Sequence, residues 1–394
     1  MIKRESEKIL FELYESFPVV TITGPRQSGK TTLVKSSFPE KPYVSLENPI
    51  VREFADNDPV GFLNQYPEGA ILDEIQRVPT LLSYIQTIVD EKQKNGIFVL
   101  TGSNQFEYIN SIDQSLAGRT GILKLLPFSY NELYSDRILR LDDILYNGFY
   151  PRIHDQKIKP VNFYSAYLST YLERDVRQIS KVHDLSIFQK FLGLCAGRTG
   201  QILNKSGLGN ECGISNKTVE EWLSVLEASF VIYRLRPYYK NINKRLIKTP
   251  KLYFYDTGLV CYLLRIEDVS QITNHPLRGE IFETFIISEF IKKRLHFGRN
   301  DNIYYFRESN GNEVDVIIDT GRGPIAIEIK SGQTVNQSMF KNLRYFSRTD
   351  NDTKGLGLVI GRDSFEIRTD CVVSGFNSVY RLYDYLLNKA DDYQ

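Results

Sequence analysis

The chain has 394 residues, with 49 Lys and Arg against 48 Asp and Glu and a formal net charge of +1. Hydrophobic residues make up 42% and charged residues 25% of it, which is ordinary for a globular protein and excludes a largely disordered, collagen-like or coiled-coil chain. At roughly 100–200 residues per domain, this length predicts two to four domains.

No stretch approaches the roughly 18 apolar residues of a transmembrane helix, and residues 1–10 lack the apolar core of a signal peptide. The four cysteines lie far apart without metal-ligand spacing, so we interpret them as reduced, partly buried thiols. They are Cys195, Cys212, Cys261 and Cys371. We therefore expect a cytoplasmic protein with no membrane partner.

The first predicted strand leads into a phosphate-binding loop. Phe17–Thr23 is a short apolar, β-branched run, which is typical of a buried strand. Gly24–Thr31 follows at once, fits the pattern GxxxxGK(S/T) without a mismatch, and precedes a helical stretch. Strand, loop and helix form the context in which this pattern binds phosphates, because the curled backbone and the helix N-terminus present N–H groups to an anion. The segment predicts ATP and Mg²⁺ as ligands.

Individual residues of this loop and of the next strand have separate expected roles in the binding and hydrolysis of ATP. Lys30 reaches the terminal phosphates, and the Thr31 hydroxyl can ligate Mg²⁺. A second apolar run ends in Asp73, a carboxylate that would hold the magnesium through water, and in Glu74, which would polarise the attacking water. The predicted nucleotide-binding set is Gly24, Pro25, Arg26, Gln27, Ser28, Gly29, Lys30, Thr31, Thr32 and Asp73.

Two further candidates follow. Gly96–Asn104 is a third apolar run with a polar end, where Ser103 or Asn104 could sense the γ-phosphate, unless it is simply a polar strand end. Arg119 could stabilise transition-state charge in cis or on a neighbouring subunit, or lie on the surface as an ordinary arginine. Alternating strands and helices predict a parallel sheet with helices on both faces.

The middle segment contains the basic excess of the chain. Residues 1–155 sum to −5, residues 156–270 to +7 and residues 271–394 to −1. The excess is densest in Val231–Lys251, which has seven Lys and Arg, no acid and three interleaved tyrosines. Such a segment suits phosphate contact and base stacking, so it is a candidate DNA surface. The alternatives are a solvated face or a docking surface for the acidic N-terminal segment.

The same region has a winged-helix pattern. Gly213–Ser215 is a turn, and Ser215 is a good helix N-cap. Apolar residues then recur at helical spacing: Val219, Trp222, Leu223 and Leu226. Phe230–Leu235 and Lys251–Tyr255 would be the two strands of the wing. Winged helices bind either DNA or proteins, so the pattern alone does not decide the partner.

The C-terminal segment predicts two carboxylates on facing strands. The expected strands are Ile303–Arg307, Glu313–Asp319 and Pro324–Lys330. If Asp319 faces Pro324 across the turn, Asp315 lies opposite Glu328 with Cβ atoms ~5 Å apart. Two like charges at that distance repel unless a cation lies between them. The pattern D…ExK then predicts the Mg²⁺ site of a restriction-endonuclease-like, PD-(D/E)xK fold, with Lys330 positioning or activating water.

A glutamate from the preceding helix completes this set. Within the helix expected over Glu280–Leu295, Glu283 lies on the apolar face, where a carboxylate needs a partner. The nuclease folds use a helix glutamate at this place, which makes Glu283 a third metal ligand. Alternatively, Glu283 pairs with Lys330 and the acids are structural relics.

Together these motifs resemble a prokaryotic AAA+ ATPase family of the archaeal type, whose members join a P-loop domain to a C-terminal domain of unknown function. The matching segments cover about residues 15–335 and are Gly24–Thr31, Leu72–Glu74, Leu100–Ser103, Gly118–Arg119, Leu126–Ser129, Gly148–Pro151, Tyr171–Asp175, Lys248–Gly258, Gly311–Asp315 and Ile327–Gly332. Gly148-Phe149 departs from the Gly-Gly of the family. The resemblance implies ATP binding and hydrolysis, a winged-helix module and a nuclease-like terminal domain.

The sequence therefore predicts an α/β protein of three domains. They are a P-loop AAA+ ATPase domain at 1–155, a helical and winged-helix domain at 156–270, and a restriction-endonuclease-like domain at 271–394. We expect an ATP hydrolase that uses Mg²⁺ and acts as a conformational switch on nucleic acid, on a protein partner or within a homo-oligomer. The alternatives are a metal-dependent DNA nuclease regulated by ATP and a non-enzymatic DNA- or protein-binding adaptor.

Overall fold

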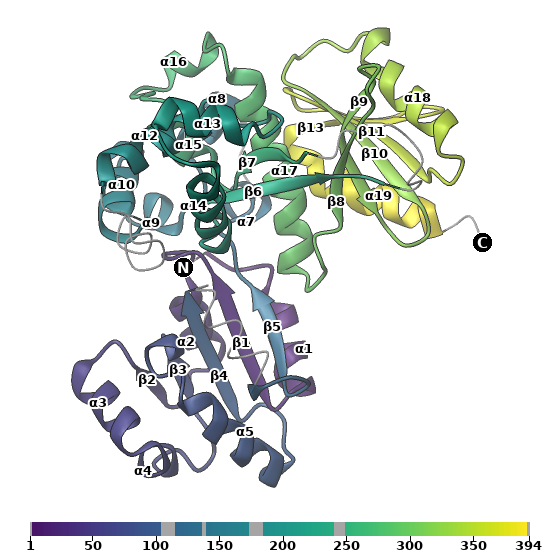
Figure 1. The fold of residues 1–394 in the computed structure, drawn as a ribbon. Coiled ribbons are helices and arrows are strands. Elements are labelled where there is room, and N and C mark those ends of the chain that lie inside the picture. The colour runs from purple at the N-terminus through teal and green to yellow at the C-terminus, as the bar shows by residue number, and fades with distance from the viewer. Residues whose placement is uncertain (1, 104–114, 136–138, 173–183, 240–248, 392–394) are drawn as a thin grey trace. The chain divides into compact units, whose positions relative to one another are not determined.

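A computed structural model describes residues 2–103, 115–135, 139–172, 184–239 and 249–391 (Figure 1). It contains two compact units. Unit 1 consists of residues 1–128, 228–230 and 294–300, and unit 2 consists of residues 129–227, 231–293 and 301–394. Across the described ranges, no helix has the length and apolar character needed to cross a membrane.

Unit 1 is built on a five-stranded sheet in the order β2-β3-β4-β1-β5. All its neighbouring strands pair in parallel, as the sequence predicted. The strands are β1 (Val19–Gly24), β2 (Tyr43–Ser45), β3 (Ile71–Asp73), β4 (Phe98–Ser103) and β5 (Thr120–Lys124). Because the strands are parallel, the carboxyl ends of β1, β3 and β4 meet at one edge of the sheet.

Helices cover both faces of this sheet, which confirms the predicted layers. They are α1 (Glu7–Ser16), α2 (Lys30–Ser37), α3 (Pro49–Asn57), α4 (Pro59–Asn64) and α5 (Leu81–Lys92), with a short 3₁₀ turn, η1 (Ile75–Arg77), after β3. On one face, α1 and α2 pack against Val20 and Ile22. On the other, α3, α4 and α5 pack against Val19 and Leu72. Side chains of β1 alternate between the two cores, so the strand is buried throughout.

Unit 2 begins with a series of helices, most of them short. Its helices are α7 (Tyr130–Tyr134), α8 (Leu141–Asn147), α9 (Pro151–Asp155), α10 (Pro160–Tyr167), the π-helical η2 (Leu168–Leu172), α12 (Leu185–Ala196), α13 (Lys205–Cys212), α14 (Asn216–Ala228), α15 (Thr257–Leu263), α16 (Ser270–Thr273), α17 (Arg278–His296), η3 (Gln337–Phe340), α18 (Lys341–Thr349), η4 (Phe376–Ser378) and α19 (Val379–Asp391). Ser215 Oγ accepts from the Thr218 amide at 3.1 Å, as expected of an N-cap, and the apolar face of α14 is buried. The four cysteines are buried and free.

An eight-stranded mixed sheet forms the rest of unit 2, in the order β12-β13-β11-β10-β9-β8-β6-β7. The strands are β6 (Ile232–Pro237), β7 (Lys251–Phe254), β8 (Ile303–Arg307), β9 (Glu313–Asp319), β10 (Pro324–Lys330), β11 (Gly355–Ile360), β12 (Phe365–Ile367) and β13 (Val372–Gly375). β6 and β7 pair antiparallel, but β6 also pairs in parallel with β8, and the winged helix remains a prediction. The expected boundary between residues 270 and 271 therefore runs through one continuous sheet, and the three-domain division remains a prediction.

The register of the β9–β10 hairpin is the one predicted from the sequence. Asp319 pairs with Pro324 and Val316 with Ile327. Helix α18 packs on the face of the sheet that includes Ile317 and Ala326. Since side chains alternate along a strand, Asp315 and Glu328 lie on this same face. These two carboxylates form the second candidate site, and the loop between β1 and α2 forms the first.

Candidate functional site

The loop between β1 and α2 has the backbone of an anion cradle. Gly24, Gln27 and Gly29 have φ of 149°, 62° and 94°, so the chain curls tightly before α2. A Cβ on Gly24 would lie 2.1 Å from the Leu125 carbonyl oxygen, which requires glycine there. Among the described residues, Gln27 Oε1 and Ser28 Oγ are buried without a hydrogen-bond partner. Unsatisfied buried polar atoms in a loop of this shape fit a site for phosphate.

The loop lysine lies against the loop itself. Lys30 is buried, and its Nζ donates to the carbonyl oxygens of Gly24 at 3.1 Å and Pro25 at 2.8 Å. Because Lys30 is also the first residue of α2, its charge adds to the positive end of that helix. The loop thus concentrates positive potential where a nucleotide's phosphates would bind.

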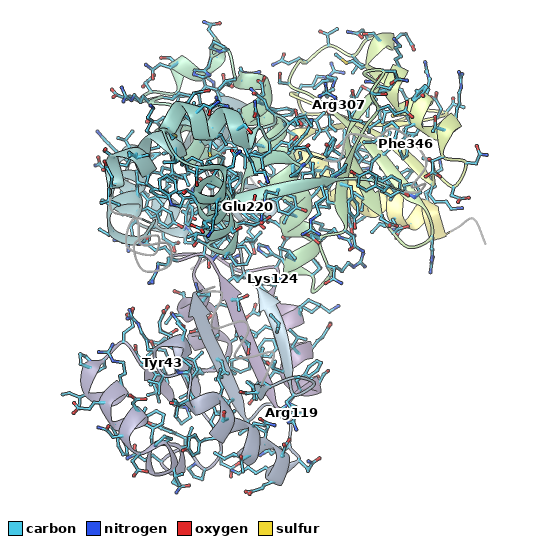
Figure 2. All side chains as sticks on the ribbon, in the orientation of Figure 1. Tyr43, Arg119, Lys124, Glu220, Arg307 and Phe346 are labelled. Carbon is cyan, nitrogen blue, oxygen red and sulfur yellow. The ribbon has the colours of Figure 1, made fainter. Side chains whose placement is uncertain are left out.

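Three hydroxyl groups converge on Asp73 at the end of β3. Thr31 Oγ1 lies 3.1 Å from each carboxylate oxygen, and Thr101 Oγ1 donates to Oδ1. The hydroxyl of Tyr43, which Figure 2 labels, donates to Oδ2 at 2.7 Å. Asp73 is 6% exposed. The two residues expected at magnesium, Thr31 and Asp73, are therefore in direct contact. Sequence reasoning missed Tyr43 and Thr101, although Thr101 belongs to the polar end of the predicted third strand.

Glu74 follows directly, with a left-handed backbone at φ 60°. Gln76 donates a hydrogen bond to its carboxylate. Burial raises the pKa of Glu74 above its ordinary value, against the lowering effects of the Lys30 and Arg26 charges. A carboxylate whose pKa moves towards neutrality is suited to accept a proton from water.

The two sensor candidates have different outcomes. Ser103 ends β4 and pairs in register with Gly24, so its backbone lies at the edge of the sheet where the loop begins. Asn104 lies outside the described residues. A sensor role at this position remains a prediction.

Arg119 lies at the opposite edge of the sheet (Figure 2). Its carbonyl oxygen accepts from the amide of Val19, the first residue of β1, whereas the loop follows the last one. At about 3.3 Å per residue, the two edges are roughly 17 Å apart. The guanidinium forms hydrogen bonds to both carboxylate oxygens of Asp90, at 2.6 and 2.8 Å. This placement does not favour the alternative in which Arg119 acts in cis, and the alternatives of a role in trans and of an ordinary surface arginine stay open.

In unit 2, the predicted carboxylates do come together. Lys330 Nζ lies 2.9 Å from Glu328 Oε1 and 3.4 Å from Asp315 Oδ2, and Asp315 also accepts from the Ile329 amide at 2.7 Å. Burial and the charge of Asp315 raise the pKa of Glu328 to about 8. Glu328 Oε2 is buried and has no partner among the described residues. A divalent cation fits this arrangement, since it would relieve the repulsion and engage the unsatisfied oxygen.

A second lysine enters the cluster from β7. Lys251 Nζ lies 3.3 Å from Glu283 Oε1 and 2.5 Å from Glu313 Oε1, and the Tyr253 hydroxyl donates to Glu283. Burial and the charge of Asp315 raise the pKa of Glu283 to about 7. Burial alone would lower the pKa of Lys251, but the surrounding carboxylates raise it instead. Glu283 is thus held by Lys251, not by Lys330 as one alternative predicted.

This finding changes the interpretation of the basic segment Val231–Lys251. Lys251 is 3% exposed, and Arg234 forms ion pairs with Glu220 and Glu227 on α14. These two side chains are already paired with carboxylates inside unit 2, so we do not expect them to contact DNA phosphates. Four other basic residues of the segment lie outside the described residues: Lys240, Lys244, Arg245 and Lys248.

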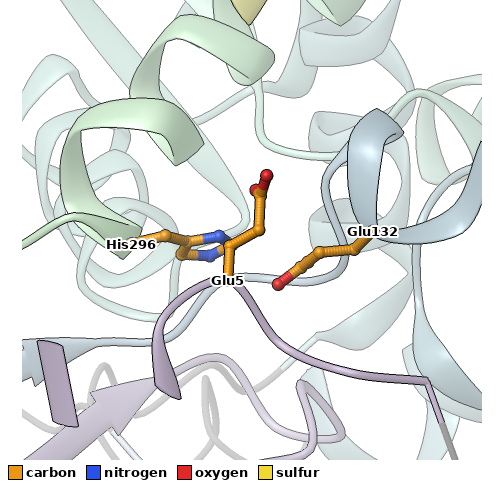
Figure 3. Close-up of side chains that lie close together, drawn as sticks. All are labelled: Glu5, Glu132 and His296. Atoms are coloured by element: carbon orange, nitrogen blue, oxygen red, sulfur yellow. The ribbon is translucent and has the colours of Figure 1, made fainter. Parts of the chain in front are cut away.

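Three further side chains carry groups that can ligate a metal: Glu5 and His296 of unit 1 and Glu132 of unit 2 (Figure 3). Within unit 2, Glu132 accepts from the Ser129 amide at 2.8 Å and completes the capping box of α7. Within unit 1, His296 Nε2 accepts from the Leu126 amide at 3.2 Å. Because Glu132 belongs to a different unit from the other two, we assign no metal site to these residues.

Comparison with protein families matches three consecutive parts of the chain. Residues 16–134 match an AAA domain, residues 138–270 a domain of unknown function (DUF8612), and residues 278–378 another domain of unknown function (DUF4143). Residues 16–134 are therefore similar to AAA domains, and this homology supports ATP binding and hydrolysis at a coarse level.

Two bacterial relatives are uncharacterized proteins. One, from Mycobacterium tuberculosis, is 28% identical over 344 residues, which are 86% of this chain and 76% of the relative. The other, from Haemophilus influenzae, is 24% identical over 294 residues, which are 66% of this chain and 72% of the relative. Among solved structures, the Walker-type ATPase of Pyrococcus abyssi has 14% identity and a TM-score of 0.44, with 67% of this chain and 96% of that chain covered.

Proposed function

We propose that this chain hydrolyses ATP with Mg²⁺ as a conformational switch that acts on nucleic acid or a protein partner. The observation that supports this proposal is the contact between Thr31 and Asp73 beside a loop that contains a buried Lys30. Thr31 and Asp73 would hold Mg²⁺, which when bound neutralises phosphate charge. Lys30 binds the terminal phosphates, and Glu74 accepts the proton of the attacking water.

ATP turnover with and without DNA tests this function in the full chain. Glu74→Gln should bind ATP but hydrolyse it about 100-fold more slowly or worse, since a general base contributes about 10²–10⁴-fold. Glu68→Gln is the matched control, because that side chain is 82% exposed and pairs only with a surface lysine among the ion pairs described here. If Lys30→Ala binds nucleotide as tightly as wild type, the assignment of the loop is wrong. Stimulation of turnover by DNA would identify nucleic acid as the partner.

The carboxylates of unit 2 favour a second candidate, a metal-dependent nuclease. Asp315, Glu328 and Glu283 would hold a divalent ion, which when bound supplies a nucleophile by lowering the pKa of water. Lys330, whose Nζ lies 2.9 Å from Glu328 Oε1, would orient that water or a phosphate oxygen. Glu283 would do so only by exchanging its present partners, Lys251 and Tyr253, for the ion.

Incubation with plasmid and Mg²⁺ or Mn²⁺ tests the nuclease. We expect cleavage by wild type and by Asp319→Asn, a carboxylate at the far end of the same hairpin. Asp315→Ala should abolish it. Cleavage that persists in Asp315→Ala would exclude this site as its origin.

A further inference from the structure

The carboxylate at the end of β3 has a partner that no motif of the chain contains. Tyr43 lies on β2, whose neighbour β3 places Ser45 beside Asp73 and Tyr43 beside Ile71. Along β2, Tyr43 therefore lies two residues before Ser45, the residue that pairs with Asp73. Its side chain is long enough for the hydroxyl to reach Asp73 Oδ2 at 2.7 Å. Lys35 Nζ of α2 lies 3.5 Å from the centre of the Tyr43 ring, a cation–π contact that fixes the ring from the other side.

The hydroxyl groups around Asp73 are not equivalent. Thr31 lies 3.1 Å from both carboxylate oxygens, and it is also the residue expected to turn towards a metal. Thr101 donates to Oδ1 and Tyr43 to Oδ2. When Thr31 turns away, one donor remains on each oxygen, so the plane of the carboxylate stays fixed.

We propose that Tyr43 is a positioning residue of the magnesium site, which orients the Asp73 carboxylate for the water molecules of the metal. This inference rests on the proposed ATP hydrolysis and adds a residue to its machinery. Tyr43 does not touch the nucleotide. Its hydroxyl donates to Asp73, which leaves the outward lone pairs of that carboxylate directed at the metal's hydration shell.

Tyr43→Phe in the full chain tests the role of the hydroxyl, because it removes one oxygen and leaves the ring on Lys35. A hydrogen bond to a charged group is worth at least about a factor of ten in an equilibrium constant. We expect the Mg²⁺ concentration for half-maximal binding of a fluorescent ATP analogue, and for half-maximal ATP turnover, to rise about tenfold. Affinity for the analogue in EDTA should not change. Tyr84→Phe is the control, since Tyr84 lies in the same unit and is 41% exposed.

The outcomes separate this inference from the function on which it rests. If Tyr43→Phe and wild type have the same Mg²⁺ dependence, the positioning role is overturned while ATP hydrolysis stands. If Tyr43→Phe also loses affinity for the analogue in EDTA, the tyrosine is merely structural and the inference is again overturned. The same holds if the loss in its free energy of unfolding equals the loss in its free energy of Mg²⁺ binding. A wild-type chain that binds no nucleotide in either buffer would overturn the proposed function first, and this inference with it.

Discussion

Lys251 should be a lysine on which the stability of unit 2 depends strongly. Its side chain is 4% exposed and forms ion pairs with Glu283 and Glu313, which are 17% and 23% exposed. Removal of one member of a buried ion pair costs about 3–5 kcal/mol, because the remaining charge is left uncompensated. Since both glutamates keep some contact with water, we expect Lys251→Met to cost about 3 kcal/mol at pH 8. For a unit of this size that corresponds to roughly 6–12 °C in Tm.

The cost should depend on pH in a definite direction. Burial already raises the pKa of Glu283 to about 7, and loss of the lysine charge raises it further. At pH 6 Glu283 is then protonated in the variant, no uncompensated charge remains on it, and the loss should shrink to about 1 kcal/mol.

Differential scanning calorimetry of the full chain at pH 6 and pH 8 measures both values. Lys205→Met is the control, because its ion pair with Glu220 joins side chains that are 48% and 42% exposed, and such a pair contributes at most about 1 kcal/mol. Equal Tm values for Lys251→Met and Lys205→Met at pH 8 would refute the reasoning. A large loss that is the same at both pH values would show that packing, rather than charge, is what Lys251 supplies.

Three further outcomes follow from the two sites. The pKa of Glu328 is raised to about 8 in the folded chain, so the folded state binds more protons there than the unfolded state between pH 5 and pH 8. The free energy of unfolding in metal-free buffer, measured by urea titration, should therefore fall from pH 5 to pH 8. Glu328→Gln should flatten this decline, and the same decline in the variant as in wild type would contradict the reasoning. Gly24→Ala should abolish nucleotide binding, measured with a fluorescent ATP analogue, because the added Cβ would lie 2.1 Å from the Leu125 carbonyl oxygen. Arg119→Ala should leave the Tm nearly unchanged, as expected of an arginine in an exposed ion pair with Asp90. It should lower ATP turnover only if a second copy of the chain uses Arg119 in trans, and a rate per chain that rises with protein concentration would reveal that.

The parts of the two sites that the sequence predicted share one property: they are local in the chain. Gly24–Thr31 is a single turn between a strand and a helix, and the facing positions of Asp315 and Glu328 follow from one short hairpin. In each case backbone periodicity and the turn fix the geometry, and no distant segment has to be placed first. Glu283 could be predicted as a candidate only because a carboxylate on an apolar helix face needs a partner. Its observed partner, Lys251 of β7, was not predicted.

The parts that the sequence did not predict come from contacts across long stretches of chain. Tyr43 reaches Asp73 from a strand of three residues, too short to give a periodic signal, and Thr101 does so from a third strand. Lys251 illustrates the opposite error. Counted as one charge in a basic segment, Lys251 indicated a DNA surface, whereas inside the fold it forms ion pairs with two glutamates. A net charge summed along a sequence contains no information about which charges are already paired.

The most recognisable motifs of the chain are also not all sites of chemistry. Asp256 caps α15 through the Leu259 amide, and its carboxylate accepts from the Phe149 amide at 2.7 Å and the Tyr164 hydroxyl at 2.6 Å. A Cβ on Gly148 would lie 2.2 Å from that hydroxyl oxygen, so glycine is required where the two motif segments meet. Asp256 is 2% exposed, and each of its carboxylate oxygens already accepts hydrogen bonds in the part of the chain that the structure describes. These motif residues therefore contribute to the packing of unit 2. Glu328 differs from Asp256, because its buried Oε2 has no hydrogen-bond partner among the described residues and could bind a ligand.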